Sequence, residues 1–287
     1  MTRRLAALAR APVMVISALF RHRELTWALA RREIGEQFSG RALGWLWTIG
    51  QPLLLILLYI FVFGYVFPAR MEERGVSGDA LAPGAAAGSA YTVYLLVGLV
   101  PWLAFADSMN RATGSILFNA ALVRQVVFPV ETLPAKSTIA AFVTQLVMTG
   151  LLLGFMFLRG GVPAAALLLP ALLAVQLAAM LGIALLLATM TVFLRDLREI
   201  VVFLTTAGLF LAPILYRPEW VESLSPVARW GLEANPITHL VRCHRDLLCG
   251  GGPHPASWLV TALFAAVALC LGGLAYRRAH HVLGELV

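Results

Sequence analysis

The 287-residue chain is 60% hydrophobic and only 13% charged, and its mean hydropathy is +0.83. Soluble domains carry about 25% charged residues, so this composition excludes an ordinary soluble protein and predicts an all-α integral membrane protein. The formal net charge of +7 does not indicate nucleic-acid binding, because the arginines flank apolar stretches instead of forming one basic face.

Residues 1–41 are predicted to form a cytoplasmic N-terminal segment that contains an amphipathic interface helix over 21–41. The narrow apolar face of this helix contains Trp27, Ala30, Ile34 and Phe38. A solvated linker beside the membrane is the alternative. The basic start and the short apolar run of 11–20 also resemble a signal peptide, but no small-x-small cleavage site follows them.

The transmembrane domain is predicted to occupy 42–287, and its first span covers 42–67. This stretch has no charged residue. As a helix it is about 39 Å long, enough to cross a hydrocarbon core of about 30 Å. Gln51 and Pro52 lie inside it, and a proline kinks a helix and frees a carbonyl that needs a partner. The span is therefore expected to face other helices or a wet path as well as lipid.

An external loop over 68–90 and a second span over 91–110 follow. The next segment, 111–136, is the most informative for function. Its stretch 115–127 is long enough for one helix, ends before Phe128-Pro129, and is too apolar for an ordinary solvated loop. A cytoplasmic helix of this kind should dock on a partner protein or on the membrane surface. A re-entrant or packed loop is the alternative.

Four more spans complete a prediction of six transmembrane helices. They are expected over 137–158, about 170–194, 200–216 and 257–276. With both termini inside, 15 of the 22 lysines and arginines lie in cytoplasmic segments, as the positive-inside rule requires.

Between the last two spans, 217–255 is too polar to cross the membrane and too apolar for an idle loop. Asn235 is a favourable N-cap and Pro236 a favourable first residue for a helix that ends near Leu248. A shorter helix is expected over 226–232. We interpret the pair as short re-entrant gate helices that dip into the outer leaflet. An ordinary surface loop with one helix is the alternative.

Motifs for enzyme chemistry are missing from the sequence. A P-loop ending at Lys136-Ser137 would need glycines where Val130 and Ala135 stand. His239, Cys243 and His244 share a predicted helix but give no regular metal-ligand set. No Ser/His/Asp set and no paired carboxylates lie at membrane depth, and we predict no catalytic residues and no metal. Aromatic residues gather in the first and fifth spans, where either an aromatic-lined path or ordinary packing explains them.

Several stretches in order along the chain resemble the permease subunits of ATP-binding-cassette exporters for lipid-linked polysaccharides, namely O-antigen, capsule and teichoic acid. The matching stretches are LARREIGEQFSGRALGWLWTIGQPLLLILLYIFVF (29–63), GLVPWLAF (98–105), NAALVRQVVFPVETLP (119–134), TVFLRDLREIV (191–201) and APILYRPEWV with ANPITHLV (212–241).

This resemblance implies a homodimeric permease of the bacterial inner membrane, bound to two copies of an ATPase subunit that holds ATP and Mg²⁺. The chain itself would bind no cofactor. The cytoplasmic coupling helix would dock on the ATPase through Ile116, Leu117, Phe118, Asn119, Leu122, Val123 and Arg124. The lipid head group would meet Arg31, Arg32 and Arg41. The aromatic path would include Tyr59, Phe63, Phe203, Tyr216 and Trp220, and the gate helices Trp230, Asn235, Pro236 and Leu240.

Two alternatives stay open at this point. One is the same permease architecture with a small molecule or a lipid as substrate. The other is a membrane-embedded enzyme of glycan or lipid processing, which would need charged or nucleophilic residues facing a cavity.

Overall fold

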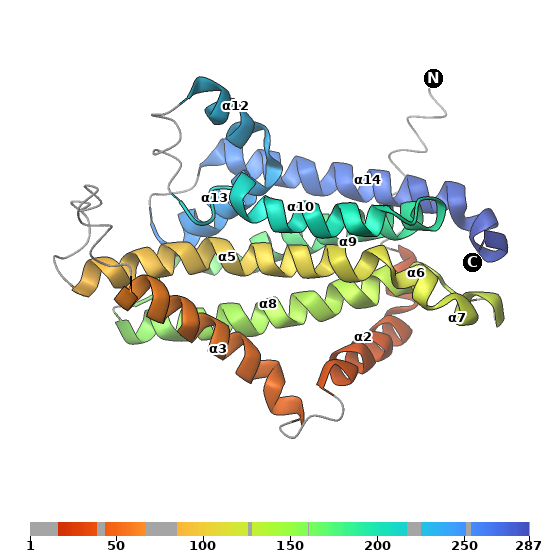
Figure 1. The fold of residues 1–287 in the computed structure, drawn as a ribbon, viewed down its shortest axis with the longest axis horizontal. Helices are drawn as coiled ribbons and strands as arrows, with labels where there is room; N and C mark the ends of the chain where they lie inside the picture. The colour runs from red at the N-terminus through yellow and green to blue at the C-terminus, as the bar shows by residue number, and fades with distance from the viewer. Residues whose placement is uncertain are drawn as a thin grey trace.

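A computed structural model of the chain describes residues 17–38, 44–66, 85–125, 128–159, 161–216, 225–250 and 254–286. All regular elements in these ranges are helices. Four long helices run side by side along the bundle (Figure 1). They are α5 (Ala85–Thr113), α8 (Thr132–Arg159), α9 (Leu169–Phe193), which η3 (Ala164–Leu168) precedes, and α14 (Pro255–Leu286). Among the described residues, these helices contain four stretches that are long and apolar enough to cross a bilayer: Tyr91–Thr113, Thr132–Arg159, Ala164–Phe193 and Pro255–Ala279.

The first and fifth predicted spans contain shorter helices. The first consists of η1 (Gly44–Leu46), α3 (Trp47–Phe61) and the π-helical turn η2 (Val62–Val66); the fifth is α10 (Leu197–Leu211). Both α3 and α10 have 15 residues, about 22 Å of helix, less than a hydrocarbon core. Figure 1 shows α3 running obliquely, with its last turn beside α5 and its first turn away from the bundle.

The closest packing in the bundle joins α9 to α14, where Gly182 faces Gly272. A Cβ atom added to Gly182 would lie 2.3 Å from the backbone carbon of Ala268. A Cβ added to Gly272 would lie 2.2 Å from the carbonyl oxygen of Gly182. Small residues allow two transmembrane backbones to approach in this way, and van der Waals packing then stabilises the pair.

A polar clamp joins α5, α8 and α9 inside the apolar core. The side-chain amides of Gln145 and Gln176 donate to each other, at 2.8 and 3.1 Å. Gln176 Nε2 also donates to the Pro101 carbonyl at 3.1 Å. Both glutamines are almost completely buried. Each amide in the clamp therefore has the partner that an apolar surrounding requires.

Replacing Gln176 by leucine should destabilise the bundle more than replacing both glutamines by leucine. The single change leaves the Gln145 amide buried without its partner, which costs about 1–3 kcal/mol, whereas the double change removes both polar groups. Thermal unfolding in detergent measures the difference. A single variant as stable as the double would show that Gln145 finds another partner.

At the N-terminal side, α2 (Arg23–Phe38) packs on α8. Of the predicted apolar face, Ala30 is buried and Trp27 is 54% exposed, while Thr26, which lies outside that face, is buried as well. Glu33 pairs with Lys136 of α8 at 3.4 Å. Small side chains let α2 approach α8 closely enough for this ion pair, so protein contact, rather than a uniform apolar stripe, orients the helix.

Candidate functional site

The predicted coupling segment lies at the end of the bundle that also holds the C-terminal end of α14 (Figure 1). The expectation of one helix over 115–127 is wrong: the structure has two short helices, α6 (Ser115–Phe118) and α7 (Ala120–Gln125). Asn119 separates them with φ −110° and ψ 25°. Its Nδ2 donates to the Ser115 carbonyl at 2.7 Å. Asparagine side chains offer the backbone this local alternative to a continuous helix.

The two short helices divide the predicted docking residues into a buried and an exposed group. Ile116 is 1% exposed and packs with Val130, Leu133 and partners on α9 and α14. It therefore anchors the segment and cannot be part of a docking surface. Phe118 and Leu122 are 68% and 43% exposed. Leu117 is partly buried and Asn119 forms the break, while the side chains of Val123 and Arg124 lie outside the described set.

A buried hydrogen bond ties this segment to the last helix. Tyr276 Oη of α14 donates to Glu131 Oε2, directly after the segment, and both residues are less than 10% exposed. On the other side, the Arg198 guanidinium at the start of α10 lies over the Phe118 ring, 5.1 Å from its centroid. The segment therefore contacts both α10 and α14 while it presents Phe118 and Leu122 outward.

At the opposite end are α12 (Pro226–Ala234) and α13 (Pro236–Leu248). The predicted cap is confirmed: the Asn235 side chain accepts a hydrogen bond from the Ile237 N–H at 3.0 Å, and Pro236 is the first helical residue. Trp230 on α12 is 78% exposed, whereas Leu240 on α13 is 1% exposed. The pair is therefore not an ordinary surface loop with one helix.

The burial of α13 was not predicted from its polar sequence. Its polar side chains contact the start of α14. The pairs are His239 Nδ1 with Ser257 Oγ at 3.1 Å, Cys243 Sγ with Thr261 Oγ1 at 3.7 Å, and Asp246 Oδ1 with His254 Nδ1 at 2.8 Å. On the exposed side, Arg242 bonds Glu233 of α12 at 2.8 Å and holds the pKa of that carboxyl below its ordinary value.

The predicted path aromatics fall into two separate groups. Tyr59 and Phe63 stack at 5.9 Å, and their row continues through Tyr91 to Tyr94 of α5. Both are partly buried and pack against the core. Phe203 of α10 is 70% exposed. Tyr216 donates through its hydroxyl to the Phe210 carbonyl at 3.0 Å, and Trp220 lies outside the described residues.

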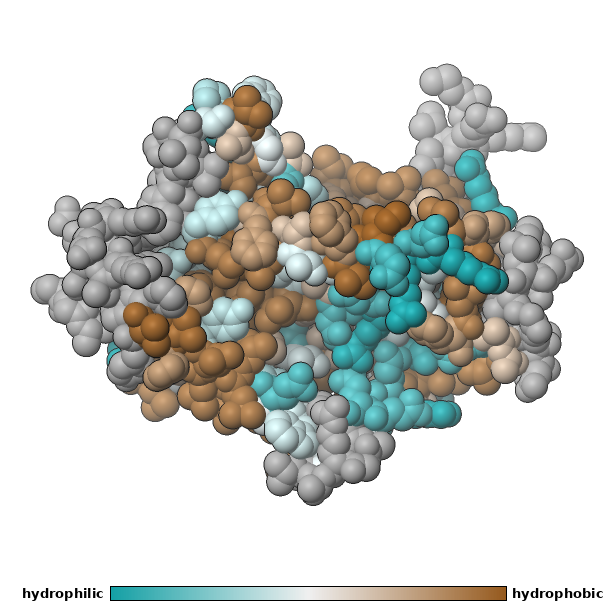
Figure 2. Space-filling model, in the orientation of Figure 1, coloured by the Kyte–Doolittle hydropathy of each residue, from teal (hydrophilic) through white to brown (hydrophobic). Residues whose placement is uncertain are grey.

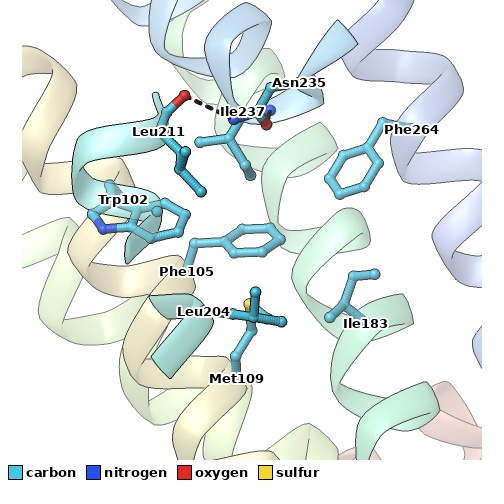
Figure 3. Close-up of a pocket in the computed structure, with 10 residues that line it drawn as sticks. Trp102, Phe105, Met109, Ile183, Leu204, Leu211, Asn235, Ile237 and Phe264 are labelled. Atoms are coloured by element: carbon cyan, nitrogen blue, oxygen red, sulfur yellow. Dashed lines mark hydrogen bonds between the residues drawn. The ribbon is translucent and has the colours of Figure 1, made fainter. Parts of the chain in front are cut away.

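A cavity of about 260 Å³ lies between α5, α9, α10, α13 and α14. It is lined by Trp102, Phe105, Met109, Ile183, Leu204, Gly208, Leu211, Asn235, Ile237 and Phe264. Figure 3 shows Phe105 and Phe264 projecting into this space, below a hydrogen bond from Asn235 Nδ2 to the Leu211 carbonyl at 3.4 Å. Apart from Asn235, the described residues that line the cavity are apolar, so the cavity offers mainly apolar contacts.

The proposed head-group arginines lie on the exposed surface of α2. Arg31 and Arg32 are both exposed, and Arg32 pairs with Glu36 at 2.6 Å; Arg41 lies outside the described residues. Figure 2 shows hydrophilic surface near α2 and the adjoining ends of α5 and α10, beside apolar surface over α3. Within the described part of the chain, no cluster of three or more histidine, cysteine or acidic residues could hold a metal ion.

Sequence reasoning missed the buried polar contacts of Arg245, Glu131 and Tyr276. In the sequence, Arg245 looked like one of several external cations. Its neighbouring residues do not indicate that it is buried. Glu131 and Tyr276 are 145 residues apart in sequence. No local pattern joins two residues at that separation.

The sequence matches the ABC-2 type transporter family over residues 24–248. The O-antigen export system permease protein RfbA of Klebsiella pneumoniae is 25% identical over 231 residues, which cover 79% of this chain and 81% of that protein. RfbA of Myxococcus xanthus is 26% identical over 236 residues, with 82% and 84% covered. The polysialic acid transport protein KpsM of Escherichia coli is 26% identical over 255 residues, with 87% and 91% covered.

The helical fold and this match together define a multi-pass membrane transport protein. The family match spans most of the chain, and the chain belongs to the ABC-2 type transporter family. The family description and the names of these relatives describe transport subunits and not enzymes.

Proposed function

We propose that the chain is the transmembrane subunit of an ATP-binding-cassette exporter that moves a lipid-linked polysaccharide, of O-antigen or capsular type, across the inner membrane. A separate ATPase subunit binds ATP and Mg²⁺ and drives transport. The observation that carries this proposal is the exposed apolar pair Phe118 and Leu122 on a segment anchored by buried Ile116. The substrate class rests on the names of the relatives, which describe O-antigen export and polysialic acid transport.

In this proposal, residues 1–41 form the cytoplasmic segment, 42–287 form a permease domain with six spans, and both termini are cytoplasmic. In this arrangement, the shorter helices α3 and α10 belong to the first and fifth spans. Continuous helical structure over 44–66 has enough residues to cross a bilayer. After α10, the non-helical turn 212–216 is supported by hydrogen bonds from α5 and α13. Irregular backbone at membrane depth requires such cover.

Two copies of the permease pair to enclose the path. The apolar surfaces of α3 and α10 support this arrangement, because both helices carry many exposed large side chains, including Leu54, Leu58, Phe203 and Phe210. These faces meet lipid or the second copy. Arg31, Arg32 and Arg41 then face the lipid head group, the aromatic residues near α3 and α10 line the path, and α12 with α13 closes its outer end.

Replacing Leu122 by aspartate should remove the ATPase from permease purified in mild detergent. A charge in the centre of an apolar docking surface is desolvated without a partner, and such changes weaken binding by about 2–5 kcal/mol, or at least tenfold. The measurement is co-purification of the native ATPase with tagged permease, with associated proteins identified and ATP hydrolysis assayed.

Matched variants separate docking from folding. Leu122→Met keeps the apolar surface and should retain the ATPase. Ile116→Asp changes a buried anchor and should reduce the yield of folded permease itself. A Leu122→Asp permease that is folded and still carries stoichiometric ATPase would contradict the docking surface. Wild-type permease that recovers no ATPase at all would contradict the proposed function.

A further inference from the structure

The outer end of α10 is held by side chains from other helices. An α-helix leaves its last carbonyls without helical partners, and these must be satisfied elsewhere. Asn235 reaches the Leu211 carbonyl at 3.4 Å, and the Tyr91 hydroxyl donates to the Leu215 carbonyl at 2.8 Å. Between them, the carbonyls of Pro213 and Ile214 accept hydrogen bonds from one residue, Arg245 of α13.

The Arg245 side chain of α13 contacts both α5 and the turn that follows α10. Its Nη1 donates to Pro213 O at 2.6 Å, its Nη2 to Ile214 O at 2.9 Å, and its Nε to Tyr94 O of α5 at 3.3 Å. The guanidinium carbon lies 3.7 Å from the centroid of the Tyr94 ring. Arg245 is only 7% exposed. A buried, permanently charged group with these contacts fixes its neighbours strongly, because each bond is charge-assisted.

Gly98 leaves the space that this guanidinium occupies. A Cβ atom at Gly98 would lie 2.9 Å from Arg245 Nη2 and 3.0 Å from Val241 Cγ1. The position of Arg245 therefore depends on the absence of a side chain on the facing turn of α5. The site therefore consists of the Arg245 side chain of α13 and the two carbonyls after α10 that accept its hydrogen bonds. On α5 it includes the Tyr94 ring and the space left by Gly98.

The rest of α10 is packed on one side, where Val201 is 1% exposed and Thr205 bonds Asn110 of α5 at 3.2 Å. One side of the helix lines the cavity through Leu204, Gly208 and Leu211. Another side is exposed, with Phe203 at 70% and Phe210 at 62%. A helix with a cavity along one side can shift more easily than a helix that is packed on every side, because few buried contacts oppose the movement there. The bonds at its outer end act together with the Asn110–Thr205 bond as restraints on that movement.

We propose that Arg245 is a positioning residue that locks the outer end of α10 to α13 and α5, and that this lock keeps the extracytoplasmic side of the permease closed at rest. Breaking the bonds to Pro213 and Ile214 lets α10 move along the cavity and opens the outer side. The opening step rests on the proposed function, whereas the lock itself is a property of the chain alone.

The lock is tested by spin-label distances between α10 and α14 in the purified full-length permease. Labels go on Phe210→Cys and Leu259→Cys, two exposed positions, with the three native cysteines replaced and labelled chain diluted with unlabelled chain. Arg245→Gln should raise the population of displaced α10 about tenfold or more, because one charge-assisted hydrogen bond is worth at least that factor. Arg242→Gln, which changes a surface ion pair on the same helix, should leave the distances unchanged.

A second variant keeps the test decisive if Arg245→Gln fails to fold. Gly98→Ala retains the arginine but pushes its guanidinium aside, and it should broaden the same distances; Gly154→Ala, where nothing lies within 4 Å, is its control. Unchanged distances in the folded Gly98→Ala and Arg245→Gln permeases would overturn the proposal. The distance experiment needs no ATPase, so its result is independent of whether the docking experiment succeeds.

Discussion

Replacing Gly182 by valine is expected to prevent the permease from folding. The new Cβ would lie 2.3 Å from the Ala268 backbone carbon and 2.4 Å from the Leu269 nitrogen. Backbone atoms cannot move aside as the end of a flexible side chain can, so α9 and α14 must separate. Overpacking usually costs about 1–3 kcal/mol, and this contact should exceed that range because no side-chain rearrangement relieves it.

The measurement is the yield of monodisperse permease after extraction, together with its unfolding temperature. Gly272→Val should behave in the same way, because its Cβ would lie 2.2 Å from the Gly182 carbonyl oxygen. Gly154→Val on α8 is the matched control, since nothing lies within 4 Å of a Cβ there. If Gly182→Val gave folded protein of normal stability, the close approach of α9 and α14 would be refuted.

This close contact illustrates what the sequence could and could not predict. Hydropathy located the long apolar helices, since each needs about 20 apolar residues to cross a bilayer. It did not indicate which helices touch, because a glycine in an apolar stretch is compatible with a contact or with a lipid-facing surface. Gly182 and Gly154 both lie in apolar stretches, and only the structure distinguishes them.

The local signals were correct where one residue type has one strong structural use. Asn235 followed by Pro236 predicted the start of α13, and the observed bond to the Ile237 N–H confirms it. Asn119 was less informative, because an asparagine in an apolar run can remain helical or can break the helix through its own side chain. Here its bond to the Ser115 carbonyl divides the coupling segment.

At the candidate site, the remaining differences between the sequence predictions and the structure come from tertiary contacts. The apolar character of 115–127 predicted a docking surface, but among the predicted docking residues whose side chains the structure describes, only Phe118 and Leu122 are exposed, while Ile116 belongs to the core. Similarly, α13 has a polar sequence, yet His239, Cys243 and Arg245 are buried and find partners on α14 and α5. Burial of polar groups depends on those distant partners, which periodicity along one helix does not indicate.

Replacing Tyr276 by phenylalanine is expected to uncouple ATP hydrolysis from export while the ATPase remains bound. The change keeps the aromatic ring in the cluster with Ile116 and Val130 but removes the hydroxyl that donates to Glu131. Loss of a hydrogen bond to a carboxyl group in a buried site costs about 1.5–3 kcal/mol, so the docking segment should follow α14 less tightly. Export should fall about tenfold or more, whereas the exposed surface at Phe118 and Leu122 is unchanged.

The measurement is the ratio of export to ATP hydrolysis. Both rates are measured together in proteoliposomes that contain the whole complex. Glu131→Gln keeps an acceptor for the Tyr276 hydroxyl and should therefore retain more coupling than Tyr276→Phe. Equal loss in both variants would indicate that the bond needs the carboxylate acceptor of Glu131, which an amide oxygen does not replace. If Tyr276→Phe left the ratio of export to hydrolysis unchanged, the bond would serve packing alone, and movement of the docked ATPase would have to reach the spans by another contact, such as that between Phe118 and Arg198.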